Sequence, residues 1–150
     1  MKVSSKNMFF KSTAVLLACV ALSMGNDSSA KPEIESKELL KTTTTTTAAQ
    51  SIHYLKTRKP QVVASEVVLP PGGETGWHKH PVPSYGFVLS GSLTVETKDG
   101  KTVKYDSGRA VVECVNTLHN GRNLGTVPVK MLVFYTGEAG RPNTVREGEK

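Results

Sequence analysis

The fold of this chain is decided by residues 71–91, which read PGGETGWHKHPVPSYGFVLSG. At the centre of this stretch, residues 78–80 read His-Lys-His. In an extended strand, side chains two residues apart leave the same face, so the two imidazoles can converge on one metal ion. Turn-forming Pro and Gly residues precede the pair, an apolar strand at residues 85–89 follows it, and a third candidate ligand, His119, lies further along. The stretch therefore predicts a metal site on a β scaffold.

Length and composition favour one all-β domain. The chain has 150 residues, which suits a single domain of ordinary size, and 37% of them are hydrophobic, which is enough for a core. Val, Thr and Tyr are plentiful, and long amphipathic helical patterns are missing. The formal net charge of +6 is spread along the chain without a basic stripe that contains aromatic residues, so nucleic acid binding is not expected.

The N-terminus has the pattern of an export signal. Three lysines lie among residues 1–11, residues 12–24 are mostly apolar, and residues 28–30 are small enough for cleavage. The apolar run is too short for a stable membrane span. We expect a signal peptide at residues 1–30 and an exported, periplasmic or secreted protein. Two alternatives stay open: a retained anchor, or a lipoprotein attached at Cys19, which follows Leu-Leu-Ala as in a lipobox.

The rest of the chain divides into a tether, a domain and a tail. Residues 31–50 contain six consecutive threonines, a low-complexity run with nothing to bury, so we expect a disordered Thr-rich linker. The folded domain is expected at residues 51–137, and the polar residues 138–150 as a loosely ordered tail. Cys114 is the only cysteine beyond the leader, so no internal disulfide is expected and the thiol is predicted to be buried.

Turn signals recur at short intervals after residue 51, which is typical of a sandwich or barrel. Asp99-Gly100 is a hairpin signal, because this pair suits a type I′ turn. Residues 116–123 are expected to form a loop around His119. The strands expected from alternation and β-branched content are residues 61–69, 76–80, 87–89, 92–97, 101–105, 109–115 and 127–135.

Across residues 62–135, the order of these pieces resembles the cupin superfamily. The first cupin motif is a Gly, five residues, His-x-His, three or four residues, a Glu, six residues and a Gly; Gly72, His78, His80 and Gly91 match it. The second is a Gly, five residues, Pro-x-Gly, two residues, His, three residues and Asn; Gly108, His119 and Asn123 match it, with Cys114 and Asn116 at the Pro and second Gly positions. The resemblance implies a single cupin β-barrel, the double-stranded β-helix or jelly roll.

The resemblance also implies a metal site, in which the family usually uses two His and a Glu from the first motif and a His from the second. The Glu position is Ser84 here, and a hydroxyl is a poor ligand for a divalent cation. The expected ligands are therefore His78, His80 and His119, with the other positions open, as in catalytic sites. Imidazole suits Fe, Zn, Cu, Ni and, less well, Mn, and the resemblance puts Fe first. A degenerate cupin without metal is the alternative.

Glu113 is unusual because it interrupts the apolar strand expected at residues 110–115. It could orient a ligating imidazole or act as a general base. It could also swing in as a fourth metal ligand, as could Glu74. The alternative is a structural role, in which Glu113 lies at the rim and pairs with Arg109 or Arg122.

The substrate is expected to be small and anionic. A divalent metal held by three neutral imidazoles keeps its full charge and attracts an anion. Arg122 is a candidate for holding a substrate carboxylate, although it could instead pair with Glu113. Ser84 and Tyr85 follow the ligand pair and are candidate substrate contacts, with core packing as the alternative for Tyr85.

By resemblance, the leading function is oxidation of a small anionic organic molecule with dioxygen, catalysed by a dioxygenase-type oxidoreductase. Cupins also include isomerases, lyases, storage proteins and sensors, and fold does not imply function. A non-catalytic module that binds a small ligand or metal in the cell envelope is the alternative, and a structural protein with an empty barrel is a third possibility. A homodimer is expected by resemblance only.

Overall fold

The computed structural model describes residues 33–149, in which all the regular elements are β-strands. None of these residues belongs to a helix long and apolar enough to cross a membrane. The strands are β1 (Pro60–Leu69), β2 (His78–Lys79), β3 (Ser84–Ser90), β4 (Ser92–Thr97), β5 (Thr102–Asp106), β6 (Ala110–Val112), β7 (His119–Arg122), β8 (Val129–Glu138) and β9 (Val145–Arg146).

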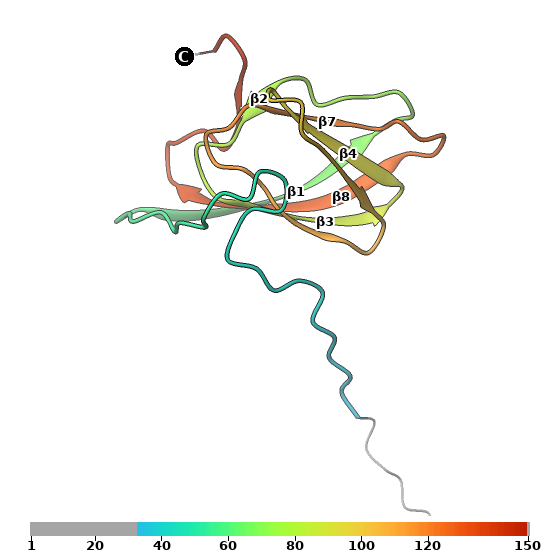
Figure 1. Cartoon of the computed structure of the whole chain (residues 1–150). Coiled ribbons are helices and arrows are strands. Elements are labelled where there is room, and N and C mark those ends of the chain that lie inside the picture. The colour runs from blue at the N-terminus through green and yellow to red at the C-terminus, as the bar shows by residue number, and fades with distance from the viewer. Residues whose placement is uncertain (1–32, 150) are drawn as a thin grey trace, which may run out of the picture. The chain divides into compact units, whose positions relative to one another are not determined.

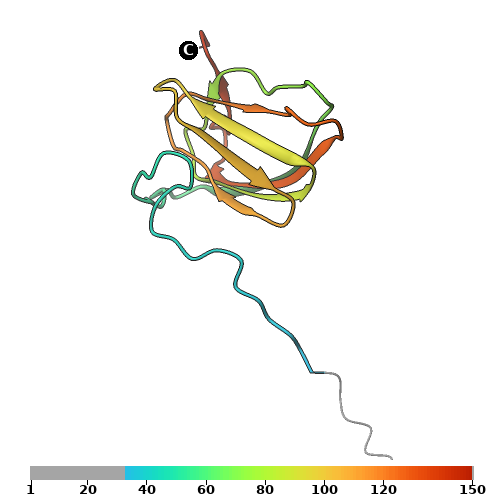
Figure 2. The ribbon, with the colours of Figure 1, turned by 45° about the vertical axis from the view of Figure 1, so that its right-hand side comes forward.

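The strands form two antiparallel sheets that face each other (Figures 1 and 2). One sheet has the order β1-β8-β3-β6 and the other has the order β5-β4-β7-β2-β9. The first sheet is built on the long β1–β8 pairing, which runs from Pro60 opposite Glu138 to Leu69 opposite Val129. This arrangement confirms the predicted all-β class and is that of a jelly roll.

The hydrophobic core lies between the sheets and follows from the period-two alternation of the sequence. In β4, buried and half-buried residues alternate along the strand, so Leu93 and Val95 turn to the same side. Val88, Val129 and Val133 do the same from the opposite sheet. The buried side chains thereby fix which face of each sheet points inward and leave the polar alternates outside.

The Thr-rich segment differs from the disordered linker expected at residues 31–50. Thr44 forms a β-bridge, the Thr46 amide donates to the Val112 carbonyl at 2.8 Å, and the side chain of Thr47 is buried. The Thr47 hydroxyl hydrogen-bonds with the hydroxyl of Tyr105 at 2.8 Å. A threonine run has no apolar face, but its hydroxyls and amides can be ordered by partners on the folded domain.

Two further segments are more regular than expected. Residues 119–122 form β7 instead of a loop, because they pair with β4, with Thr97 opposite His119. In the predicted tail, β9 pairs with β2 and places Arg146 opposite His78. The expected signal peptide at residues 1–30, with Cys19, lies outside the described residues.

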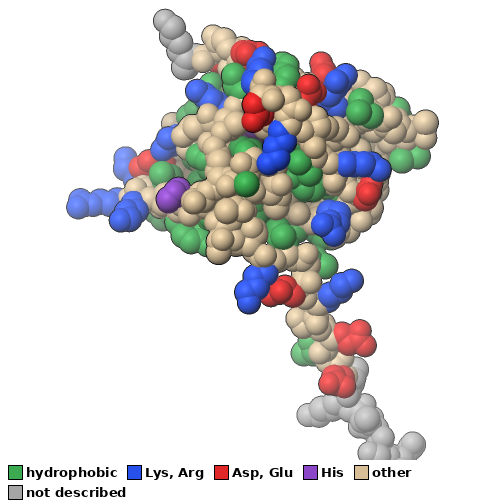
Figure 3. All heavy atoms as spheres, in the orientation of Figure 1, with side chains coloured by type: hydrophobic (Ala, Val, Ile, Leu, Met, Phe, Trp, Pro, Cys, Tyr) green, Lys and Arg blue, Asp and Glu red, His purple; other side chains and the backbone are tan. Residues whose placement is uncertain are grey.

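Charged side chains are mixed on the surface. The space-filling view shows Lys and Arg side chains interspersed with Asp and Glu on the visible described face (Figure 3).

We predict that Gly91→Ala destabilises the protein more than Gly100→Ala. Both glycines have positive φ, +75° and +82°, and an alanine there costs about 1–2 kcal/mol. At Gly91 a Cβ would also lie 2.7 Å from the Pro128 carbonyl oxygen, whereas nothing lies within 4 Å at Gly100. Overpacking adds about 1–3 kcal/mol at Gly91. Urea unfolding measures the two losses, and equal losses would contradict this packing.

Candidate metal centre

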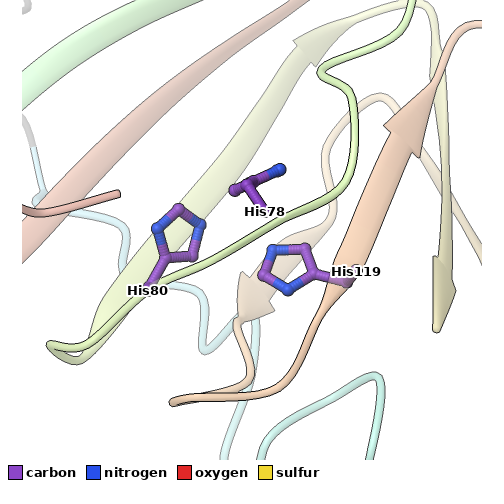
Figure 4. A group of neighbouring side chains, drawn as sticks. All are labelled: His78, His80 and His119. Atoms are coloured by element: carbon purple, nitrogen blue, oxygen red, sulfur yellow. The ribbon is translucent and has the colours of Figure 1, made fainter. Parts of the chain in front are cut away.

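Three buried histidines from the two halves of the chain meet inside the protein (Figure 4). His78 on β2 lies directly opposite His119 on β7, and His80 follows two residues after His78. The exposed fraction is 7% for His78, 2% for His80 and 3% for His119. The ring centroids are 4.4 Å apart for His78 and His119, 4.9 Å for His78 and His80, and 5.0 Å for His80 and His119. The three histidines are therefore positioned to hold one metal ion, as their spacing predicted.

Each of the three rings is oriented by a backbone carbonyl. Nδ1 lies 2.7 Å from the Gly76 oxygen in His78, 2.9 Å from the Asn143 oxygen in His80, and 2.8 Å from the Thr117 oxygen in His119. A carbonyl can only accept, so Nδ1 carries the proton in each ring. In a neutral imidazole this leaves the Nε2 lone pair free, as a metal ligand requires.

The donor set fits a divalent transition metal. Nε2 of His119 is buried and has no hydrogen-bond partner among the described residues. Leaving such a polar atom unsatisfied costs about 1–3 kcal/mol, and a bound metal would satisfy it. The ligand atoms of the three histidines all lie within 4.8 Å of one another. Metal–nitrogen bonds of about 2.1 Å place adjacent ligand atoms roughly 3–4 Å apart, so little rearrangement is needed.

A carboxylate belongs to the same cluster. Oε2 of Glu113 lies 2.7 Å from Nε2 of His80 and 3.8 Å from Nε2 of His119, and its side chain is 12% exposed. The hydroxyl of Ser84 donates to the same oxygen at 3.1 Å. Glu113 is thus turned towards the histidines, and Ser84 contacts this carboxylate. The pairing with Arg109 or Arg122 that the sequence left open is not the one observed.

The charges of the cluster are set by burial and by the contact between His80 and Glu113. Burial lowers the pKa of His78 to about 4 and also lowers the pKa of His119. Burial alone would raise the pKa of Glu113, but the hydrogen bond and charge of His80 outweigh it and bring that pKa to about 2. Burial likewise opposes protonation of His80, yet Glu113 raises its pKa. Without metal, His80 and Glu113 therefore form an ion pair.

A cavity of about 290 Å³ opens beside the histidines. Glu113, Tyr135 and Arg146 provide polar groups in its wall. Glu74, Thr75 and Thr144 also line the cavity. The apolar part of the wall is contributed by both sheets, through Val67, Leu69, Leu93, Val95, Met131 and Val133.

The other residues singled out in the sequence lie in different places. Arg122 ends β7 with a half-exposed side chain, 3.6 Å from carboxylate oxygens of both Glu74 and Glu96. Neither Arg122 nor Tyr85 is among the cavity-lining residues, whereas Glu74 is. The substrate contacts expected of Arg122, Ser84 and Tyr85 stay predictions.

Sequence reasoning missed four polar residues of the cavity wall, Thr75, Tyr135, Thr144 and Arg146. Tyr135 shares strand parity with Met131 and Val133, so the alternation in β8 contained a signal for it. Arg146 lies in the Gly- and Pro-rich tail, where no periodic pattern predicts a strand. Only the pairing of β9 with β2 brings it to the site.

Comparison with protein families identifies the fold. A family model described as "Cupin domain" matches residues 65–135, a segment that contains both motifs and all three histidines. Residues 65–135 therefore form a cupin domain, and the resemblance noted in the sequence is confirmed. No curated protein matches the chain.

Solved structures support the same fold. The DMSP lyase DddQ from Ruegeria pomeroyi DSS-3 is 21% identical, with a TM-score of 0.51 over 59% of this chain and 44% of the lyase. The oxalate decarboxylase of Lactobacillus farciminis, solved as a formate complex, is 20% identical, with a TM-score of 0.50 over 57% of this chain and 26% of the decarboxylase. The matched part thus spans less than half of the length of the lyase and of the decarboxylase. At these identities the likeness shows the fold alone.

We predict that the metal-free protein loses stability on acidification through His78. Its pKa is about 4 in the folded state and 6.5 ordinarily, so its contribution is present above pH 6.5 and lost as the pH falls through about 4. The loss is on the order of 3 kcal/mol. His80, whose pKa is raised, changes stability only above pH 6.5. Urea unfolding in chelator should show this decline between pH 6.5 and 4, and His78→Gln should make it shallower and leave the part that His119, whose pKa is also lowered, contributes. An unchanged slope in the variant would contradict the assignment.

We also predict that the C-terminal segment is required for metal binding. Deleting residues 143–150 removes β9 and the carbonyl that orients His80. Loss of a group that orients a ligand costs about 10–100-fold in metal affinity. Chelator competition with Co(II) measures this change, and deletion of residues 148–150 alone, which keeps β9, is the control. Equal affinity in both truncated proteins would show that the strand plays no part.

Proposed function

We propose that this protein is a mononuclear metal-dependent oxidoreductase that oxidises a small anionic organic molecule with dioxygen. One observation carries the proposal: three imidazoles positioned to hold one metal ion line a cavity instead of being closed over by protein. Sites with open coordination positions are catalytic in character, whereas structural zinc sites are closed by four protein ligands. When bound, Fe(II) in such a site would supply the electrons and the Lewis acidity for dioxygen chemistry.

The size and charge of the cavity support a small anion as the substrate. Its volume of about 290 Å³ corresponds to roughly ten water molecules. The guanidinium of Arg146 lines it and donates to the Thr75 carbonyl at 3.1 Å. The Glu149 carboxylate accepts from the backbone amide of Arg146 at 2.9 Å. Among the described residues, no carboxylate lies within salt-bridge distance of the Arg146 guanidinium. A metal and an arginine together offer two positive groups to an anionic substrate.

Two features of the wall would position that substrate. Burial raises the pKa of Tyr135, so its phenol stays protonated at neutral pH and can donate a hydrogen bond. The Tyr135 ring lies 5.4 Å from the ring of His80, close enough for a substrate bound at the metal to reach both. The apolar residues of both sheets would contact the uncharged part of such a substrate.

The export of this protein is also a proposal, and the N-terminal sequence supports it. The lysine-rich start, the apolar run and the small residues before residue 31 are typical of a signal peptide. Mass determination of the chain recovered from a cell-envelope or medium fraction would show a new N-terminus near residue 31. Recovery of the full-length chain in the cytoplasm alone would contradict export.

Oxygen consumption tests the proposed function. The protein is loaded anaerobically with Fe(II), and uptake is then followed with a panel of small carboxylates, enolisable acids and thiols. We expect uptake that depends on one class of substrate and falls to background in the His78→Ala/His119→Ala variant. A matched control is His53→Ala, since His53 is exposed and lies outside the site.

The opposite result is equally informative. Tight binding of the metal and of a small anion without turnover would contradict the oxidoreductase proposal and leave the non-catalytic binding module. Failure to bind any divalent metal would also contradict the oxidoreductase proposal and leave a barrel that binds a small ligand without metal.

A further inference from the structure

We propose that Glu113 is the fourth protein ligand of the metal, and that it takes the place of the carboxylate that position 84 lacks. The inference rests on the metal-binding part of the proposed function and is independent of the oxidation chemistry. The first sequence motif would place the carboxylate ligand on β3, at position 84. The inference places it instead on the segment that follows β6, at Glu113.

The first argument is the strand register. In the β3–β6 pair, Tyr85 lies opposite Val112, so Ser84 lies opposite Glu113, and the Glu113 amide donates to the Ser84 carbonyl at 3.0 Å. Residues directly opposite in an antiparallel pair project on the same face. A side chain at position 113 therefore enters the same space as one at position 84.

The second argument is the position of the carboxylate. Its Oε2 atom is 2.7 Å from Nε2 of His80 and 3.8 Å from Nε2 of His119. Ligand atoms that share a metal at about 2.1 Å are roughly 3–4 Å apart. The observed distances are close to this range without any movement of the backbone. Glu113 thus lies within ligand spacing of His80 and His119, and its carboxylate needs to turn towards His78 to share the ion that the three histidines would hold.

The third argument is charge compensation. Glu113 is largely buried, and a buried carboxylate requires a cation or it destabilises the fold. In the described residues the only cationic partners within salt-bridge distance are His80 and His119. A divalent ion bound by these two imidazoles would lie beside the carboxylate and balance its charge.

The fourth argument is that Ser84 makes room for Glu113 and supports it. It is 1% exposed, and its hydroxyl donates to Oε2 of Glu113 at 3.1 Å. A glutamate at position 84 would place a second carboxylate in the same space, and like charges there repel. A serine is small enough to admit Glu113 and fixes its orientation. The two residues thus form a matched pair, with the ligand on one strand and its support on the other.

A fourth ligand changes the charge of the site and its preference among metal ions. Three imidazoles and one carboxylate reduce the charge of a divalent ion at the site to +1. They also leave two positions of an octahedron open instead of three. Carboxylate oxygen favours Fe and Mn more than a site of imidazoles alone does. An anionic substrate would then depend more on Arg146 than on the metal charge.

The test compares four proteins: the wild type, Glu113→Gln, the transposed Ser84→Glu/Glu113→Ser variant, and Ser84→Ala. Circular dichroism and metal-free melting first establish that each is folded. Chelator competition then gives Co(II) affinity, and visible absorption reports the ligand set. We expect Glu113→Gln to lose more than about 100-fold in affinity, which exceeds the range for groups that only orient ligands. We expect the transposed variant to recover most of that affinity and the wild-type type of spectrum.

Ser84→Ala is the control, because it removes a support and no ligand. We expect it to keep the wild-type spectrum, with a loss within about 10–100-fold. Unchanged Co(II) affinity and absorption in Glu113→Gln would overturn the inference, and so would a crystal structure of the Co(II)-loaded protein with Glu113 more than about 3 Å from the metal. These readouts do not involve turnover, so the fourth ligand can be established even if oxidation of a substrate is disproved.

Discussion

The site depends on three hydrogen bonds from ring Nδ1 atoms to backbone carbonyls. Because carbonyls only accept, these bonds place a proton on Nδ1 of each imidazole, so that Nε2 is the nitrogen that would bind the metal. The carbonyls belong to residues 76, 117 and 143, just before β2, β7 and β9. The site therefore requires that β2 lie between β7 and β9. The backbone of the fold thus orients the imidazole side chains that would bind the metal.

Burial makes this arrangement costly without an ion. The cluster holds one carboxylate and three imidazoles away from water, and burial lowers the pKa of both His78 and His119. Without metal, a proton between His80 and Glu113 balances the charge. A divalent ion would displace that proton and satisfy the unpaired Nε2 of His119. Metal loading and the stability of the sheet edge are therefore coupled.

The sequence predicted the fold class and the three histidines well, because both depend on local periodicity and on short spacings around turns. It predicted the Thr-rich segment and the C-terminal tail poorly, since both are ordered by distant partners, as when the Thr46 amide reaches Val112 and β9 pairs with β2. Glu113 stood out as a polar interruption, but its partner could not be read without the register that places it opposite Ser84. Arg146 had no periodic signal at all.

The most direct test of the central claim is the metal content of the protein purified without chelator, measured beside the His78→Ala/His119→Ala variant. The account predicts about one equivalent of a divalent transition metal per chain, lost in the variant while the fold is retained. A protein that contains no metal and takes none up on reconstitution would contradict it, as would a metal retained equally by the variant.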